Sequence, residues 1–157
     1  MKKQHGFTLV EVMVAVAIMG VLASTIGITM GVLLGQRVKS MAADTKSVMQ
    51  STQMVSFSRD DAYVEFKQNG KVAEVVAYSS AGKEIMRAEG HGVQLYLTIN
   101  GSEHKVSSAE KIQFDRQTGG LKSQVPGANA YVSAIRVTNG NRSITLKISK
   151  LTGKVTY

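Results

Sequence analysis

The chain has no cysteine and no tryptophan, and Pro126 is its single proline. Without cysteine, neither a disulfide framework nor a thiolate metal site can form. This absence does not fix the compartment, but it means that an extracytoplasmic domain of this chain must be stable without disulfides. The 157 residues are enough for one domain, and an apolar segment takes the first third. The remaining ~100 residues can bury a modest core.

One stretch of the chain lacks charged residues, and another lacks acidic ones. Val12 to Gly35 holds no charged residue, and Arg116 to Tyr157 holds no acidic one. The second stretch carries seven basic residues: Arg116, Lys122, Arg136, Arg142, Lys147, Lys150 and Lys154. This asymmetry indicates an electropositive face in the C-terminal part of the chain. Two interpretations stay open, a solvated strand face that keeps the protein soluble and a surface that binds an anionic ligand.

The apolar stretch is long enough to cross a membrane. Val12 to Leu34 supplies 23 residues, and a spanning helix needs about 20. The cleavable core of an ordinary secretory signal is shorter, about 7–15 residues. A simple membrane anchor explains the length but leaves Glu11 unexplained, because a carboxylate in lipid is costly without a partner. Lys2 and Lys3 favour a cytoplasmic N-terminus, although Arg37 and Lys39 at the other end weaken that assignment.

The first residues resemble a known family. Lys2-Lys3-Gln4-His5-Gly6-Phe7-Thr8-Leu9-Val10-Glu11 is similar to the type III signal of type IV pilins and of type II secretion pseudopilins. The resemblance implies that prepilin peptidase cuts between Gly6 and Phe7 and that Phe7 is then N-methylated. It also implies a leader peptide at residues 1–6. Many pilins carry a helix-breaking proline midway along the segment that follows, and residues 25–31 here contain none.

Glu11 lies four residues after Phe7, about one helical turn away. After cleavage, the new amine of Phe7 and the carboxylate of Glu11 would attract strongly in apolar surroundings. The resemblance implies that Glu11 captures the Phe7 amine of a neighbouring subunit and sets the register of packed helices. Pairing within one chain and a simple favourable interaction with the helix dipole remain the alternatives.

From residue 36 onward the pattern becomes amphipathic. Apolar and small residues recur at three- and four-residue steps, as in one face of a helix. They are Val38, Met41, Thr45, Val48, Thr52 and Val55. We therefore predict one helix over residues 7–57, spanning the membrane at about 12–35 and packing its second half on a soluble domain. A break near Gly35-Gln36 stays open as the alternative.

Residues 58–157 read as a β-rich globular domain. Short strands separated by turn signals are predicted at 63–67, 72–78, 93–99, 111–114, 131–138, 143–149 and 155–157. Asn69-Gly70 and Asn100-Gly101 favour tight hairpins, since both residue types tolerate positive φ. The fold class is therefore α+β, a long N-terminal helix on a mainly antiparallel β domain. The C-terminal strands, with Thr152-Gly153-Lys154, resemble minor pseudopilins, a group in which two sheets follow the helix. Another pilin branch is the alternative.

No catalytic constellation is visible in the sequence. His91, in a predicted Gly90-His91-Gly92 loop, and His104 lack the spaced partners that a metal site would require, and both are predicted to lie on the surface. Nothing matches a nucleophile elbow or a phosphate-binding loop. We therefore predict no enzyme activity, no catalytic residue, no metal and no cofactor.

Three functions compete on this sequence. The first is a minor pilin or pseudopilin of a type IV pilus-like or type II secretion filament. It implies other pilin subunits, prepilin peptidase and an inner-membrane assembly platform as partners, and a single pass through the cytoplasmic membrane with the globular domain outside. The second is a filament-displayed minor pilin that binds DNA through the seven C-terminal basic residues. The third is an anchored surface protein that never assembles.

Overall fold

The computed structural model describes residues 8–58, 61–124 and 129–157, and the side chains of residues 25–34 lie outside that description. The chain divides into two units, residues 1–35 and 36–157. The predicted leader and the predicted cleavage site between Gly6 and Phe7 lie outside the described residues.

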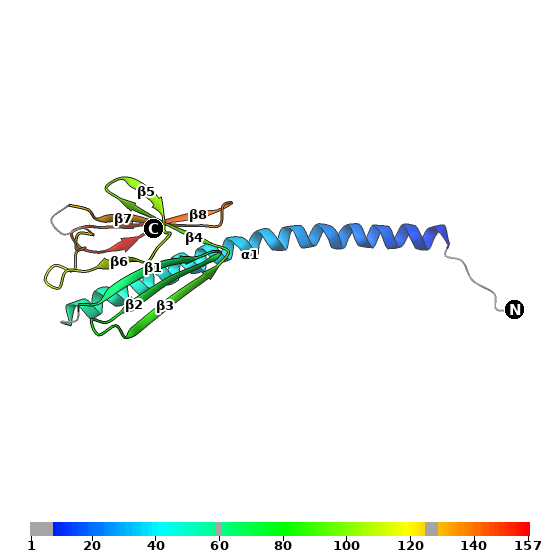
Figure 1. The fold of residues 1–157 in the computed structure, drawn as a ribbon. Coiled ribbons are helices and arrows are strands. Elements are labelled where there is room, and N and C mark those ends of the chain that lie inside the picture. Colours follow the sequence, from blue (N-terminus) through cyan, green and yellow to red (C-terminus); the bar gives the residue numbers. More distant parts are fainter. Residues whose placement is uncertain (1–7, 59–60, 125–128) are drawn as a thin grey trace. The chain divides into compact units, whose positions relative to one another are not determined.

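Helix α1 comprises Leu9–Phe57 (Figure 1). Its last residue is the one predicted from the amphipathic pattern. It begins two residues later than predicted, because Thr8 stands outside the helix as its N-cap. In the first unit every described side chain from Leu9 to Ser24 is exposed.

Among the described residues of the second unit, nine strands form two antiparallel sheets. The four-stranded sheet has the order β3-β2-β1-β6, from β1 (Tyr63–Asn69), β2 (Val72–Tyr78), β3 (Glu84–His91) and β6 (Glu110–Gln113). The five-stranded sheet has the order β5-β4-β7-β8-β9, from β4 (Gln94–Ile99), β5 (Ser102–Lys105), β7 (Val132–Thr138), β8 (Ser143–Ile148) and β9 (Val155–Thr156). The α+β class is confirmed.

One core joins the second half of α1 to the inner faces of both sheets. Of the predicted helix positions, Val38, Met41, Thr45, Val48 and Thr52 are buried and Val55 is half-buried, and the pattern missed Ala42, Met49 and Ser56 on the same face. Phe66 in β1 and Phe114, which directly follows β6, are the largest fully buried side chains of the described residues. Figure 1 shows strands β1 to β3 running along this half of the helix.

The Asn-Gly hairpins form, but in two ways. Asn100 and Gly101 both have positive φ, 51° and 81°, between the paired residues Ile99 and Ser102. This is the predicted geometry for a two-residue turn whose twist suits a hairpin. Between β1 and β2, by contrast, Asn69 is still a strand residue, and the turn consists of Gly70 and Lys71.

Strands β3 and β5 were not predicted. Residues 84–87 of β3 are all exposed, so they lack the alternation that marks a half-buried strand. Strand β5 reads Ser-Glu-His-Lys, which has no apolar residue. The predicted loop around His91 is wrong, since Gly90 and His91 end β3 and only Gly92 belongs to the turn.

The last turns of α1 are clamped by two loops of the sheet region. The amide Nε2 of Gln53 donates to the carbonyl oxygens of Gly119 (2.7 Å) and Thr152 (2.6 Å). A Cβ on Gly119 would come within 2.4 Å of the Phe57 ring, and a Cβ on Gly153 within 2.2 Å of the Gly119 oxygen. Glycine is therefore required at both positions.

Candidate assembly site

Thr8 and Glu11 form a reciprocal capping box at the start of α1. The Glu11 Oε2 atom accepts hydrogen bonds from the backbone N–H of Thr8 (2.8 Å) and from its hydroxyl (2.9 Å). The Thr8 hydroxyl in turn accepts from the backbone N–H of Glu11 (3.3 Å). Two backbone donors that a helix start leaves without partners are thus satisfied.

The capping box shows that Glu11 has a role within its own chain. Sequence reasoning treated its interaction with the helix start as a dipole effect and missed the directed hydrogen bonds. The signal was present as Thr-x-x-Glu, the spacing of a capping box. Both bonds to the carboxylate end on Oε2. A carboxylate offers about four acceptor positions, so the group retains capacity for a further donor.

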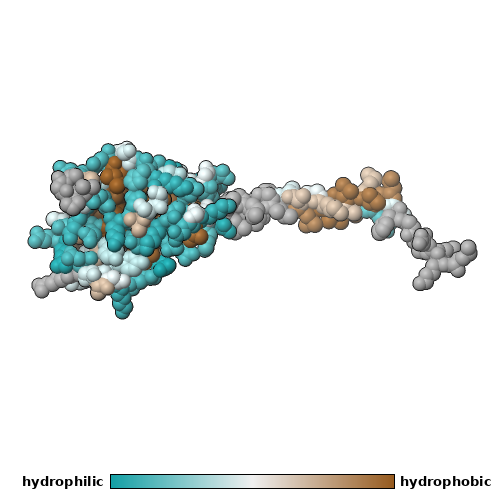
Figure 2. All heavy atoms as spheres, viewed as in Figure 1, coloured by the Kyte–Doolittle hydropathy of each residue, from teal (hydrophilic) through white to brown (hydrophobic). Residues whose placement is uncertain are grey.

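The helix beyond this cap presents apolar side chains on all sides. Leu9, Val10, Met13, Met19 and Leu22 are each more than half exposed. Figure 2 shows the resulting hydrophobic surface along this part of the helix. A helix that is apolar all round is found buried in a protein core or in lipid.

Within the described residues, no helix is long and apolar enough to cross a membrane. Ten of the residues in the predicted span, 25–34, are those whose side chains are not described. The span over residues 12–35 therefore stays a prediction.

Within the described residues, the seven C-terminal basic residues fall into two groups, three that form ion pairs and four that do not. Arg116 and Lys122 both pair with Asp61, at 2.7 and 3.3 Å. Arg136 lies over the Tyr96 ring and forms a two-bond pair with Glu103, whose pKa is lowered by the guanidinium hydrogen bonds. These three cations are matched by acids from earlier in the chain, which the local run of sequence could not reveal.

The other four basic residues lie along strand β8 and its two ends. Arg142 is in the turn before β8, Lys147 is exposed on it, and Lys150 and Lys154 follow it. None of the four forms an ion pair within the described residues. The amine of Lys150 lies 4.0 Å from the centre of the Tyr131 ring.

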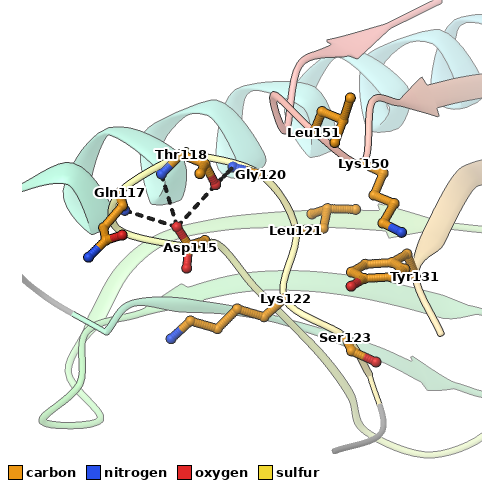
Figure 3. Close-up of a pocket in the computed structure, with 10 residues that line it drawn as sticks. All are labelled: Asp115, Gln117, Thr118, Gly120, Leu121, Lys122, Ser123, Tyr131, Lys150 and Leu151. Atoms are coloured by element: carbon orange, nitrogen blue, oxygen red, sulfur yellow. Dashed lines mark hydrogen bonds between the residues drawn. The ribbon is translucent and has the colours of Figure 1, made fainter. Parts of the chain in front are cut away.

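Lys122 and Lys150 line one open pocket of about 460 Å³. In Figure 3 the two side chains extend in different directions, Lys150 beside Tyr131 and Lys122 away from both. Asp115 stands at the same pocket, and its Oδ1 accepts from the Thr118 backbone and hydroxyl and from the Gln117 backbone. These bonds lower the pKa of Asp115. DNA binding by the seven basic residues stays a prediction, and three of the seven are already paired with acidic side chains.

Both histidines have acidic partners in the fold, contrary to the sequence interpretation. His104 Nε2 lies 2.9 Å from Glu110, and His91 Nε2 lies 3.0 Å from Glu89. Neither pair is joined by a third ligand, and no group of three metal-binding side chains occurs within the described residues. His91 is exposed, as predicted, whereas His104 is half-buried.

Comparison with protein families gives one match. Residues 1–27 match the family model described as the prokaryotic N-terminal methylation motif. No curated protein and no solved structure matches the chain. The motif supports a type IV pilin-like protein, a filament subunit that prepilin peptidase processes and that assembles with other pilins. It favours a structural role over an enzymatic one.

The final β8–β9 hairpin and the two sheets agree with the minor pseudopilin resemblance, but they do not define that subgroup.

Proposed function

We propose that this protein is a minor pilin or pseudopilin of a type IV pilus-like or type II secretion filament. It is cut between Gly6 and Phe7, methylated on Phe7, and built into the filament through its N-terminal helix. One observation carries the proposal: a methylation motif leads directly into a helix that exposes apolar side chains on every side. Such a helix needs lipid before assembly and other helices after it.

Before assembly, residues 12–35 anchor the chain in the cytoplasmic membrane as a single pass. The basic leader keeps the N-terminus in the cytoplasm, where prepilin peptidase and the assembly platform act, and the globular unit lies on the other side. The anchor must be reversible, because a filament subunit leaves the membrane when it assembles.

During assembly, Glu11 receives the methylated amine of Phe7 from a neighbouring chain. The Thr8 bonds on Oε2 fix the orientation of the carboxylate and leave acceptor positions open. A charge pair in apolar surroundings is strong, so one such pair per subunit can set the axial register.

The test is incorporation into filaments by variants of the full chain. We expect Glu11→Gln and Glu11→Ala to abolish incorporation while the cellular amount of processed protein stays unchanged. Glu89→Gln, a carboxylate on the exposed edge of the globular unit, is the matched control and should assemble normally. Normal assembly of Glu11→Ala would contradict the proposed role of Glu11, and absence of the unsubstituted chain from filaments would favour an anchored protein that never polymerises.

A further inference from the structure

Cations without acidic partners gather at one end of the globular unit. Arg37 lies within α1, at the second residue of the globular unit, Lys71 is in the β1–β2 turn, and Arg142 is in the β7–β8 turn. All three are exposed, and none forms an ion pair within the described residues. We call Arg37, Lys71 and Arg142 the basic collar.

The contacts between the turns place the collar residues together. The backbone N–H of Gly92 donates to the Lys71 carbonyl (2.7 Å), and a Cβ on Gly92 would lie 3.6 Å from Nη1 of Arg37. Lys71, Gly92 and Gly140 line one pocket of about 280 Å³. Gly140 and Arg142 share the turn closed by the Asn139 and Arg142 backbones. Figure 1 shows both turns at the same end of the unit.

At the opposite end of the unit, some of the cations are paired with an acid. Residues 36–57 of α1 extend about 30 Å, so the ends are well separated. There Arg116 and Lys122 share one carboxylate, Asp61, while Lys150 and Lys154 form no ion pair within the described residues. Near the collar, Glu89 lines a pocket with Arg37 and lies 3.0 Å from His91. Lys39, two positions after Arg37, adds a further exposed cation. Unpaired cations therefore occur at both ends of the unit, and the collar is the group that includes Arg37, close in the chain to the proposed membrane anchor.

Chain connectivity places the collar next to the proposed membrane anchor. Gly35 and Arg37 are two residues apart, so their Cα atoms are at most ~7.6 Å apart whatever the orientation of the two units. If residues 12–34 occupy lipid, Arg37 lies at the level of the headgroups. Basic residues at that level are attracted to anionic lipids, by roughly fivefold in affinity for each Lys or Arg.

We propose that the basic collar docks the globular unit on anionic phospholipid headgroups before assembly. This inference rests on the proposed function, because the apolar segment must be in the membrane for the collar to reach it. Docking holds the unit against the surface by charge alone, and the subunit can therefore be released when it enters the filament. The contact weakens with salt.

The absence of cysteine makes a direct test possible in the full chain. Asn141→Cys places one fluorophore in the turn beside Arg142, and Leu151→Cys places one at the other end of β8. Each protein is incorporated into phosphatidylcholine nanodiscs with or without phosphatidylglycerol, with a quencher on the lipid headgroups. We expect phosphatidylglycerol to increase quenching at position 141 but not at 151, and high salt to reverse the increase.

Matched charge variants separate docking from general attraction. Arg37→Gln/Lys71→Gln/Arg142→Gln should lower the equilibrium constant for docking about fivefold for each cation removed. Lys83→Gln/Lys147→Gln/Lys154→Gln removes the same charge away from the collar and should leave quenching unchanged.

Equal effects of the two triple variants, or quenching that does not depend on phosphatidylglycerol, would overturn the inference but not the proposed membrane anchor. Failure to enter any nanodisc would overturn both. A gel shift of duplex DNA that depends on the collar residues would reassign the surface to nucleic acid and overturn the lipid assignment.

Discussion

The two halves of helix α1 are built from similar apolar residues but meet their environment in opposite ways. Met49, in the second half, is fully buried in the core, whereas Met19, in the first, is 66% exposed. The second half has an apolar stripe with polar residues beside it, and the first half has apolar residues all round. Within the described residues, the chain buries side chains of the second half only, and a helix that is apolar on all sides is typical of one surrounded by lipid or by other helices.

The largest effect should come from matched methionine truncations. Met49→Ala leaves a cavity in the core and should lower the free energy of unfolding of the globular unit by about 2–5 kcal/mol. Met19→Ala should change it by less than about 0.5 kcal/mol. Thermal unfolding of the full chain in detergent measures both. A comparable loss from Met19→Ala would show that the first half also supports the globular fold.

A second pair of variants tests the close packing of the sheet loops against the last turns of α1. Gly153→Ala forces a Cβ against the Gly119 oxygen at a φ of +64° and should destabilise the unit by about 3 kcal/mol or more. Gly82→Ala has a similar φ of +74° but open space, and should cost about 1–2 kcal/mol. Chemical denaturation compares the two. Equal losses would mean that the close packing around Gly153 adds nothing to the cost of placing alanine at a positive φ.

A smaller effect is expected at the start of the exposed half. Thr8→Ala removes the hydroxyl of the capping box and should make amide exchange in the first turn about fivefold faster. Thr8→Ser keeps the oxygen and should restore protection. Hydrogen exchange of Val10 to Val12 in nanodiscs measures this. If Thr8→Ala exchanges like the unsubstituted chain, surrounding lipid or neighbouring chains fix the helix start instead of the cap.

The smallest effect is expected from low pH, which should open the turn that Asp115 stabilises in the globular unit. The hydrogen bonds from Thr118 and Gln117 hold the pKa of Asp115 below its ordinary value. A carboxyl whose pKa is lower in the folded than in the unfolded state adds stability above the unfolded value and loses it as the pH falls through the folded one. The turn should therefore persist through the ordinary aspartate range and open only below it. An NMR titration of Asp115 checks this, and Thr118→Val should raise its pKa. An ordinary midpoint in the unsubstituted chain would refute it.

Much of the fold could be predicted because its signals are local. The periodicity of Val38 to Thr52 marks the buried helix face, and Asn100-Gly101 marks a two-residue turn. Strand β3 could not be predicted in this way, since Glu84 to Arg87 are exposed and carry no alternating pattern. The four-stranded sheet also takes β6 from beyond β4 and β5, and local patterns do not specify such non-local pairing.

The candidate site was predictable in part for the same reason. The methylation motif and Glu11 are readable from ten consecutive residues, and the capping box with Thr8 was readable but was not recognised. The division of the basic residues was not readable. Asp61 lies 55 residues from Arg116, and Glu103 lies 33 residues from Arg136, so only the folded chain reveals that these cations are paired.

The most direct test of the central claim is the intact mass of the protein extracted from its native membrane. Processing as a pilin-like subunit predicts a chain that begins at Phe7, lacks residues 1–6 and carries one additional methyl group. A native protein that retains Met1 to Gly6, or that begins at an unmodified residue elsewhere, would contradict the claim.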